Sequence, residues 1–313
     1  MSVLAIYNPV AGGGRAGREW PQIEPMLQRH FPALTVRATR GPGDASTLAA
    51  EAARSGIGLV IVCGGDGTIS EVVDGLLRAR AFEGAGAPKL GIIPDGTGSD
   101  LSKTLGFAGD LNSQVERIAR GDFRRIDAGR LTFETDSGDA AVRHFVNIAS
   151  LGLSGPTSRA VNAARAKRRF GAKLVFMFHT IRELLRYRFQ EVRVTIDEAA
   201  PIEARIALVA IANGKFFGGG MMIAPQALID DGVAEVVVFR GDNKLRLIRD
   251  INTLYTGEHV KLDVVTMLKG RKVRVEPVGD RALNSACLDI DGESPGRIPA
   301  TFEILPGALE VAR

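Results

Sequence analysis

Three short apolar runs in the first hundred residues each end in a glycine-rich loop, and this pattern most limits how the chain can fold. The runs are Val3–Tyr7, Leu59–Cys63 and Leu90–Pro94, and their loops cover residues 8–14, 64–70 and 94–100. Each run is typical of a buried strand, and helical patterns follow the loops. Strands that alternate with helices form a mostly parallel sheet covered by helices on both faces. We therefore predict an α/β domain over residues 1–126.

The second part of the chain has a different pattern, in which Gly, Asp and Asn turns separate short strands. Arg143–Ser150 is one such predicted strand. Two helical inserts interrupt the series, near Ser158–Tyr187 and Leu245–Thr256. Strands separated by turns are typical of an antiparallel sandwich, so we predict a β-sandwich domain with helical inserts over residues 127–299. The sequence leaves open whether the last strand, about 300–313, returns to the first domain.

Composition limits the class of protein. The chain has 313 residues, of which 45% are hydrophobic and 24% charged, and these values are typical of a globular protein long enough for two domains. A net charge of +4 gives a weak field, so nucleic acid is not an expected partner. Cys63 and Cys287 make no disulfide framework and favour a reducing cytoplasm. No apolar run approaches the roughly 20 residues of a spanning helix, so we expect any membrane contact to be peripheral, on the inner face.

The three loops are expected to bind the phosphates of a nucleotide. Parallel strands share one carboxyl edge, and ligands bind there where the strand order reverses. Glycine lets the backbone approach a ligand closely, and a helix N-terminus offers N–H groups to anionic oxygens. One such loop is more simply a tight connection, but three in register favour phosphate. Asp66 would then need a cation or a proton donor beside it. Neither the Walker pattern nor the dinucleotide fingerprint is present.

Four motifs give the chain a resemblance to a known family. They are Asn8-Pro9 with its glycines, Gly64-Gly65-Asp66-Gly67-Thr68, the loop Gly96–Leu101, and Asp291-Gly292-Glu293. With them the chain resembles the diacylglycerol-kinase-type catalytic family, which includes bacterial lipid kinases and sphingosine kinases. Gly218–Gly220 and residues 225–232 look most like the bacterial YegS-type members. The resemblance implies a Rossmann-like domain of the NAD-kinase and phosphofructokinase kind, followed by a β-sandwich.

The resemblance also implies a site for ATP and Mg²⁺. Asp66 would help to order Mg²⁺ beside the phosphates, and Glu293 would be the general base, with Asp291 in the same turn. Two acids so close can project from one loop, and their repulsion would raise one pKa. Taken alone, Asp-Gly-Glu is more simply a solvated turn. The residues implied to bind the nucleotide are Asn8, Pro9, Thr39, Gly64, Gly65, Asp66, Gly67, Thr68, Ile69, Ser70, Gly96, Thr97 and Gly98.

A second metal is implied near residue 230. Backbone carbonyls of Leu228 and Val233 and the carboxylate of Asp231 would hold it, since hard cations take such oxygen ligands. The alternative is a plain turn between strands. Elsewhere, Ser99 stands where the family usually has Asn, and its hydroxyl is shorter than an Asn side chain. Asp100 either caps the following helix at its N-terminus or has a functional role.

Residues 159–188 are a candidate membrane contact. Acidic residues are absent between residues 140 and 182, whereas Arg and Lys recur there and an apolar stripe follows at helical spacing. Such a basic amphipathic segment is typical of peripheral binding to an anionic leaflet. The alternative is an ordinary helix with a solvated basic face.

Together these features predict an ATP-dependent kinase that phosphorylates a lipid hydroxyl. Diacylglycerol, phosphatidylglycerol and sphingoid bases all offer one. An NAD kinase-like enzyme shares the Gly-Gly-Asp-Gly loop, but the late Asp-Gly-Glu argues against it. A catalytically silent nucleotide or lipid sensor has no chemical need for Asp66 and Glu293 together. The sequence leaves the oligomeric state open, including a homodimer.

Overall fold

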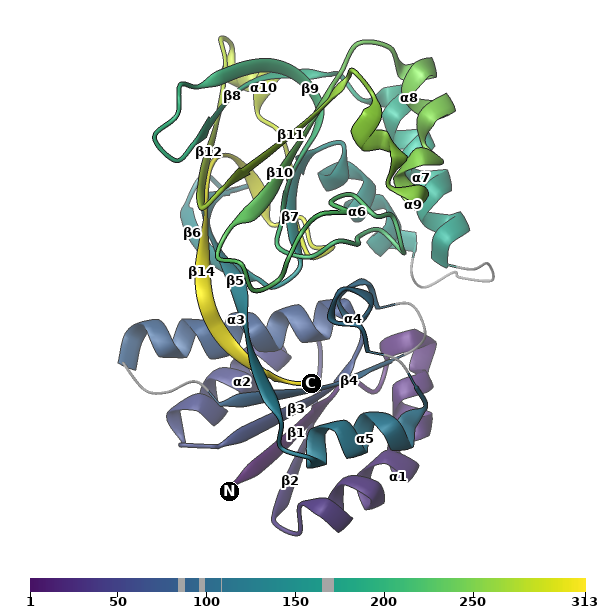
Figure 1. The fold of residues 1–313 in the computed structure, drawn as a ribbon, viewed down its shortest axis with the longest axis vertical. Helices are drawn as coiled ribbons and strands as arrows, with labels where there is room; N and C mark the ends of the chain where they lie inside the picture. The colour runs from purple at the N-terminus through teal and green to yellow at the C-terminus, as the bar shows by residue number, and fades with distance from the viewer. Residues whose placement is uncertain (84–87, 96–98, 108, 165–171) are drawn as a thin grey trace. The chain divides into compact units, whose positions relative to one another are not determined.

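The structure, a computed structural model, describes residues 1–83, 88–95, 99–107, 109–164 and 172–313. It divides into two compact units (Figure 1). Unit 1 comprises Met1–Ala128 together with Pro306–Arg313, and unit 2 comprises Gly129–Leu305. Unit 1 is an α/β unit and unit 2 is rich in antiparallel strands. The predicted fold class is thus confirmed.

Unit 1 alternates strands and helices along the chain. Its elements are β1 Val3–Tyr7, α1 Ala11–His30, β2 Leu34–Ala38, α2 Asp44–Arg54, β3 Leu59–Gly64, α3 Asp66–Glu83, β4 Lys89–Pro94, α4 Asp100–Leu105 and α5 Leu111–Ala119. β5 Phe123–Thr135 begins here and continues into unit 2. The helix α5 was not predicted.

The sheet of unit 1 is parallel and covered on both faces. Its strand order is β14-β4-β3-β1-β2. On one face, α1 and α5 pack against the strands, and Trp20, Ile23 and Ile118 are buried there. α2 and α3 pack against each other on the opposite face (Figure 1). Apolar runs such as Leu59–Gly64, buried along their whole length, are what a strand covered on both faces requires.

The end of the chain lies in unit 1. β14 Gly296–Ala312 runs from unit 2 into unit 1, where Val311 pairs with Leu90 of β4 in parallel. The buried Arg117 of α5 donates to the carbonyls of Ala312 (2.8 Å) and Ile92 (2.5 Å), which ties the two strands together. Burial lowers the pKa of this guanidinium to about 10, and it remains a cation at neutral pH.

Unit 2 combines antiparallel strands with two helical inserts. Its elements are β6 Ala140–Phe145, β7 Ile148–Gly152, α6 Ser154–Ala164, α7 Ala172–Arg186, β8 Gln190–Ile196, β9 Ile202–Ala212, β10 Ala234–Arg240, α8 Lys244–Asp250, α9 Thr253–Thr256, a 3₁₀ turn Glu258–Lys261, β11 Val265–Gly270, β12 Lys272–Pro277, α10 Arg281–Asn284 and β13 Leu288–Ile290. The strand β11 was not predicted.

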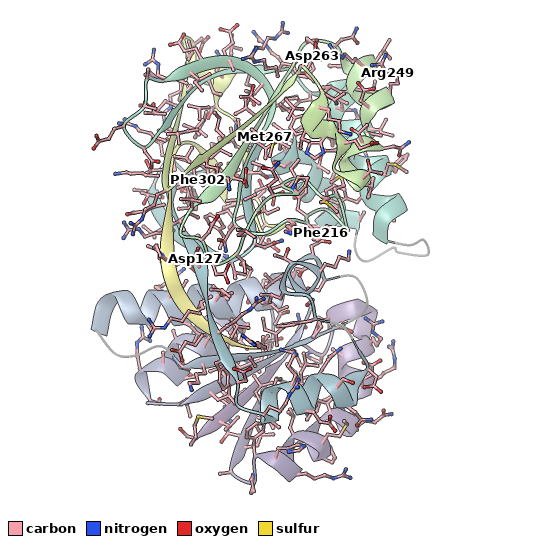
Figure 2. All side chains as sticks on the ribbon, in the orientation of Figure 1. Asp127, Phe216, Arg249, Asp263, Met267 and Phe302 are labelled. Carbon is pink, nitrogen blue, oxygen red and sulfur yellow. The ribbon has the colours of Figure 1, made fainter. Side chains whose placement is uncertain are left out.

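The core of unit 2 lies between its strands. Phe145, Phe302 and Leu131 are fully buried in it, and Figure 2 shows Phe302 on β14. The predicted single strand Arg143–Ser150 is wrong in one respect. It is divided into β6 and β7, because the backbone N–H groups between them bind the side chain of Asp291 instead of a neighbouring strand.

Candidate functional site

The first two glycine-rich loops lie where the strand order of unit 1 reverses. β1 pairs in parallel with β2 on one side and with β3 on the other, and the chain moves outward in both directions from this point. The loops after β1 and β3 therefore leave the same edge side by side. This edge is the usual ligand site of an open α/β sheet.

Asn8 joins these two loops. Its Nδ2 donates to Thr68 Oγ1 (3.0 Å) at the start of α3, and its Oδ1 accepts from the Val10 N–H (3.1 Å). The backbone of the first loop then passes through Gly12–Gly14, which have φ values of 58°, 71° and 83°. Non-glycine residues rarely adopt such angles. The regular part of α1 follows these glycines.

Asp66 is held by the loop that follows β4. Its Oδ1 accepts from the Ser99 hydroxyl and from the Leu101 N–H (3.4 Å), and its Oδ2 accepts from the Asp100 N–H (3.1 Å). Ser99 thus supplies a hydrogen bond to Asp66 with its short hydroxyl. Ser99 is also the N-cap of α4, since its Oγ accepts from the Ser102 N–H. Of the two alternatives for Asp100, the helix cap is therefore wrong.

Asp95 belongs to the same edge and was missed by the sequence analysis. It follows β4, its side chain is 1% exposed, and its Oδ1 accepts from Arg15 Nε at 2.8 Å. Within the described residues its buried Oδ2 has no hydrogen-bond partner. A Cβ atom added to Gly12 would lie 2.1 Å from this oxygen, so the glycine is needed for the loop to approach Asp95. The place of Asp95 in the site becomes visible only through its hydrogen bond with Arg15, which is 80 residues away in the sequence.

The remaining predicted nucleotide-binding residues divide by exposure. Gly65, Asp66 and Gly67 are partly exposed at the start of α3. Thr39, Thr68, Ile69 and Ser70 are buried, so their side chains support the loops from below. Gly64 is buried at the end of β3, while Asn8 and Pro9 are partly exposed. Gly96, Thr97 and Gly98 lie outside the described residues.

The Asp-Gly-Glu motif forms a tight turn in unit 2. The Ile290 N–H donates to the Glu293 carbonyl at 2.7 Å, and the Glu293 N–H donates to the Ile290 carbonyl at 2.9 Å. Asp291 and Gly292 have φ values of 47° and 92°, as the central residues of a type I′ turn do. The carboxylate of Asp291 accepts from the N–H groups of Val146, Asn147 and Ile148 at 2.9 to 3.2 Å. Asp291 therefore anchors the turn to the chain between β6 and β7.

Glu293 is the acid of this turn that remains available. Its side chain is exposed, and no hydrogen bond or ion pair of its carboxylate occurs in the described part of the chain. Asp66 belongs to unit 1 and Glu293 to unit 2, so their joint action stays a prediction.

Asp289 is a further acid near the turn, and the sequence analysis did not single it out. Its Oδ2 accepts from Ser158 Oγ and its Oδ1 from the Gly292 N–H, both at 2.9 Å. Burial raises the pKa of Asp289 to about 7, and the charges of Asp291 and Glu293 add to this increase. The sequence predicted a pKa raised by repulsion within the Asp-Gly-Glu turn, and the pKa of the neighbouring Asp289 is raised mainly by burial.

The predicted metal site near residue 230 offers one carboxylate. Asp231 Oδ1 accepts from the Val233 N–H at 3.2 Å, and Oδ2 lies 3.9 Å from Lys269 Nζ. The ammonium of Lys269 also pairs with Glu235 at 2.9 Å. A cation at Asp231 would thus compete with a lysine. Among the described residues, no three His, Cys, Asp or Glu side chains gather as metal ligands.

An apolar pocket lies between the helices and strands of unit 2. Its open space is about 720 Å³, including the part that opens to solvent. Residues from α6, α7, α8, α9, β9 and β10 line it, among them Thr157, Phe176, Leu184, Leu208, Leu247 and Leu254. The lining is almost entirely apolar, and such a lining suits an apolar chain.

The predicted membrane segment, residues 159–188, covers α7 and part of α6, and α8 lies beside it. Phe178 and Leu185 of α7 and Leu245 of α8 are 63%, 56% and 73% exposed. Lys244 Nζ donates to the Leu185 carbonyl at 2.8 Å, so the two helices adjoin there. Four basic residues of this segment, Arg165, Lys167, Arg168 and Arg169, lie outside the described residues. No described helix combines the length and the apolar character needed to span a bilayer.

Two family models match the chain. Residues 147–313 match the model described as the YegS C-terminal NAD kinase beta sandwich-like domain. Residues 2–131 match the model described as the diacylglycerol kinase catalytic domain. Between them they cover both units.

Individual relatives are similar over nearly their whole length. A protein of Mycobacterium tuberculosis (strain ATCC 25618 / H37Rv) named diacylglycerol kinase is 29% identical, over 99% of this chain and 94% of its own. One of the same name from Staphylococcus saprophyticus is 27% identical, over 98% and 93%. A solved structure from Bacillus anthracis str. Sterne is 28% identical, with a TM-score of 0.76, over 99% of this chain and 96% of its own. Yeast NADH kinase, at 12% identity and a TM-score of 0.55 over 99% and 82%, shares the fold.

Proposed function

The chain belongs to the family defined by the YegS C-terminal NAD kinase beta sandwich-like domain and the diacylglycerol kinase catalytic domain, and we propose that it transfers the γ-phosphate of ATP to a lipid hydroxyl. Relatives named diacylglycerol kinase support this class of reaction. The structural observation that carries the proposal is the Asp-Gly-Glu turn, which is fixed by Asp291 and leaves Glu293 exposed.

ATP would bind with its phosphates on the loops after β1 and β3. The partly exposed Gly65 precedes α3, a helix of 18 residues that begins with Asp66 and Gly67, and its N-terminal N–H groups suit anionic oxygens. Asp66 and the unpartnered Oδ2 of Asp95 are hard oxygen donors of the kind Mg²⁺ prefers. Mg²⁺, when bound there, would neutralise charge on the phosphates. A second cation, held by the carbonyls of Leu228 and Val233 and the carboxylate of Asp231, remains part of the proposal.

Glu293 would act as the general base. As the lipid oxygen forms its bond to the γ-phosphorus, the bond to the ADP oxygen breaks and the hydroxyl proton passes to the Glu293 carboxylate. Phosphoryl transfer depends mainly on positioning and charge neutralisation. A base held on a fixed turn would supply the proton acceptor without needing a strained or buried carboxylate.

The lipid would bring its apolar chains to the pocket of unit 2. The exposed Phe178, Leu185 and Leu245 lie on helices that line this pocket, and such side chains suit insertion at a membrane interface. We expect Phe178→Ser combined with Leu185→Ser to lower co-sedimentation with phosphatidylglycerol vesicles. Leu283→Ser, which removes a 45% exposed leucine from α10, is the control. Unchanged sedimentation of the double variant would refute this contact.

The decisive test is transfer of label from γ-labelled ATP. The purified chain is incubated with Mg²⁺ and micelles of dioleoylglycerol, phosphatidylglycerol or sphingosine, and the product is identified. We expect Glu293→Gln to lower kcat by about 100-fold or more and to leave binding of a fluorescent ATP analogue unchanged. Glu198→Gln, at another exposed acid of unit 2, is the control. A fully active Glu293→Gln enzyme would remove Glu293 from the mechanism.

Two other outcomes would replace the proposal. Label transfer to NAD and to no lipid would make the chain an NAD kinase-like enzyme. Nucleotide binding without transfer to any acceptor would indicate a silent sensor.

A further inference from the structure

Helix α6 holds the Asp-Gly-Glu turn at three points. Asn162 Nδ2 donates to the Gly292 carbonyl and Arg159 Nε to Ser294 Oγ, both at 2.9 Å. Ser158 Oγ donates to Asp289 (2.9 Å), which in turn accepts from the Gly292 N–H. The helix thus binds the residues on both sides of Glu293.

These contacts come from one turn of the helix. Ser158 and Asn162 are four residues apart and share a face, and Arg159 flanks them. An ion pair between Arg159 and Asp136, at 2.9 Å, limits how far Arg159 can turn. Any rotation or translation of α6 would therefore move the donors on which the turn depends.

The buried part of this network is costly to form. Asp289 and Ser158 are 5% and 3% exposed, and a buried carboxyl group loses its hydration. An apolar pair would pack there without that cost. Polar networks in a core specify one arrangement when all their members are satisfied, and both Asp289 oxygens are satisfied here. The network therefore fixes the turn in one position rather than simply filling space.

The same helix forms part of the wall of the apolar pocket. Ser154 and Thr157 of α6 line the pocket beside Phe176 of α7. Ser154 Oγ also accepts from Ser150 Oγ at 2.8 Å, and Ser150 pairs with Asp289 across β7 and β13. One helix of 11 residues therefore contacts both the pocket and the network beneath the turn.

We propose that α6 couples the apolar pocket to Glu293. Ser158, Arg159 and Asn162 are positioning residues, and an apolar chain in the pocket fixes α6 and thereby the turn that carries Glu293. This inference rests on the proposed function, in which Glu293 takes the proton of a lipid hydroxyl. It predicts that acyl chains contribute to kcat as well as to binding, because their contact energy is used to place the base.

Steady-state kinetics test the catalytic half of the inference. In the wild type, dioleoylglycerol should give a higher kcat than dihexanoylglycerol. In Asn162→Ala we expect kcat with dioleoylglycerol to fall by about tenfold or more, the chain-length dependence of kcat to vanish, and the KM for ATP to stay constant. Ser158→Ala should act in the same direction and Ser158→Thr should retain activity. Ala163→Ser, at an exposed neighbour on α6, is the matched control.

Amide hydrogen exchange tests the coupling without catalysis. Dioleoylglycerol added without ATP should slow exchange at residues 290–294 of the wild type and of Ala163→Ser, but not of Asn162→Ala. If no lipid is phosphorylated while this protection is seen, the proposed function fails and the coupling stands. The coupling is overturned if the lipid does not slow exchange at residues 290–294 of the wild type. It is also overturned if Asn162→Ala and Ser158→Ala both keep the kcat of the wild type.

Discussion

Replacing Asp289 with Asn should change how the stability of unit 2 depends on pH. Burial raises the pKa of Asp289 to about 7 in the native state, from an ordinary value of 3.8. Between these values the native protein holds a proton that the unfolded chain releases. The free energy of unfolding therefore falls as the pH rises through this range. The stabilisation is fully present below pH 3.8 and is lost above pH 7.

The expected magnitude follows from the same two values. They differ by about three pH units, and each unit corresponds to 1.36 kcal/mol, so the wild type should lose about 4 kcal/mol between pH 4 and pH 8 relative to Asp289→Asn. Asn does not titrate, so the variant lacks this dependence. The contribution of other groups cancels when the two proteins are compared at each pH.

The assay must separate the two units. The chain has one tryptophan, Trp20, which is buried in unit 1, so its fluorescence follows that unit during urea unfolding. Circular dichroism follows both units, and the transition absent from the fluorescence belongs to unit 2. Asp263→Asn is the control, because the hydrogen bond from Arg246 lowers the pKa of that exposed carboxyl. Replacing Asp263 with Asn should leave the pH dependence of the free energy of unfolding unchanged between pH 5 and pH 8.

Two results would refute the prediction for Asp289. If the difference between wild type and Asp289→Asn stays constant from pH 4 to pH 8, Asp289 is not a buried carboxyl that binds a proton on folding. A change in the fluorescence transition alone would place the effect in unit 1 and would equally refute the reasoning.

Two further predictions concern unit 1. Gly12→Ala should weaken binding of a fluorescent ATP analogue more than Gly13→Ala does, because both residues have positive φ but only the first added Cβ would meet Asp95, at 2.1 Å. Equal losses would show that backbone strain alone matters. Burial raises the pKa of the Cys63 thiol to about 12, and the thiolate is the reactive form. In a Cys287→Ser variant, Ellman's reagent should therefore label the chain at pH 8 only after unfolding, and rapid labelling of the native protein would contradict the burial.

The strands of unit 1 could be predicted because their signal is local. The run Val3–Tyr7 corresponds to β1 residue for residue, and Leu59–Cys63 falls one residue short of β3. Each run is apolar throughout, because a parallel strand that is covered on both faces has no solvent-facing side and so no alternating polar residues. The glycines that end these runs placed the loops correctly, at the edge where the strand order reverses.

The contacts that shape the candidate site could not be predicted in the same way. Arg15 and Asp95 are 80 residues apart, and Ser158 and Asp289 are 131 residues apart. No local pattern joins such pairs, because only the completed fold brings them together. The same reason explains why the sequence left the role of Asp100 open. Composition makes it a good helix cap, but Ser99 has the extended backbone that the cap position requires.

The Asp-Gly-Glu motif shows how tertiary contacts assign roles that spacing leaves equal. Both acids could have been the base from the sequence alone. Asp291 has a positive φ, which Asp tolerates better than Glu, and its short side chain reaches three backbone N–H groups. Glu293 is the last residue of the turn, and its backbone is hydrogen-bonded to that of Ile290. Its longer side chain therefore extends from a backbone that is held in place. Exchanging the two acids would therefore leave the composition of the motif intact while removing both the anchor and the available carboxylate.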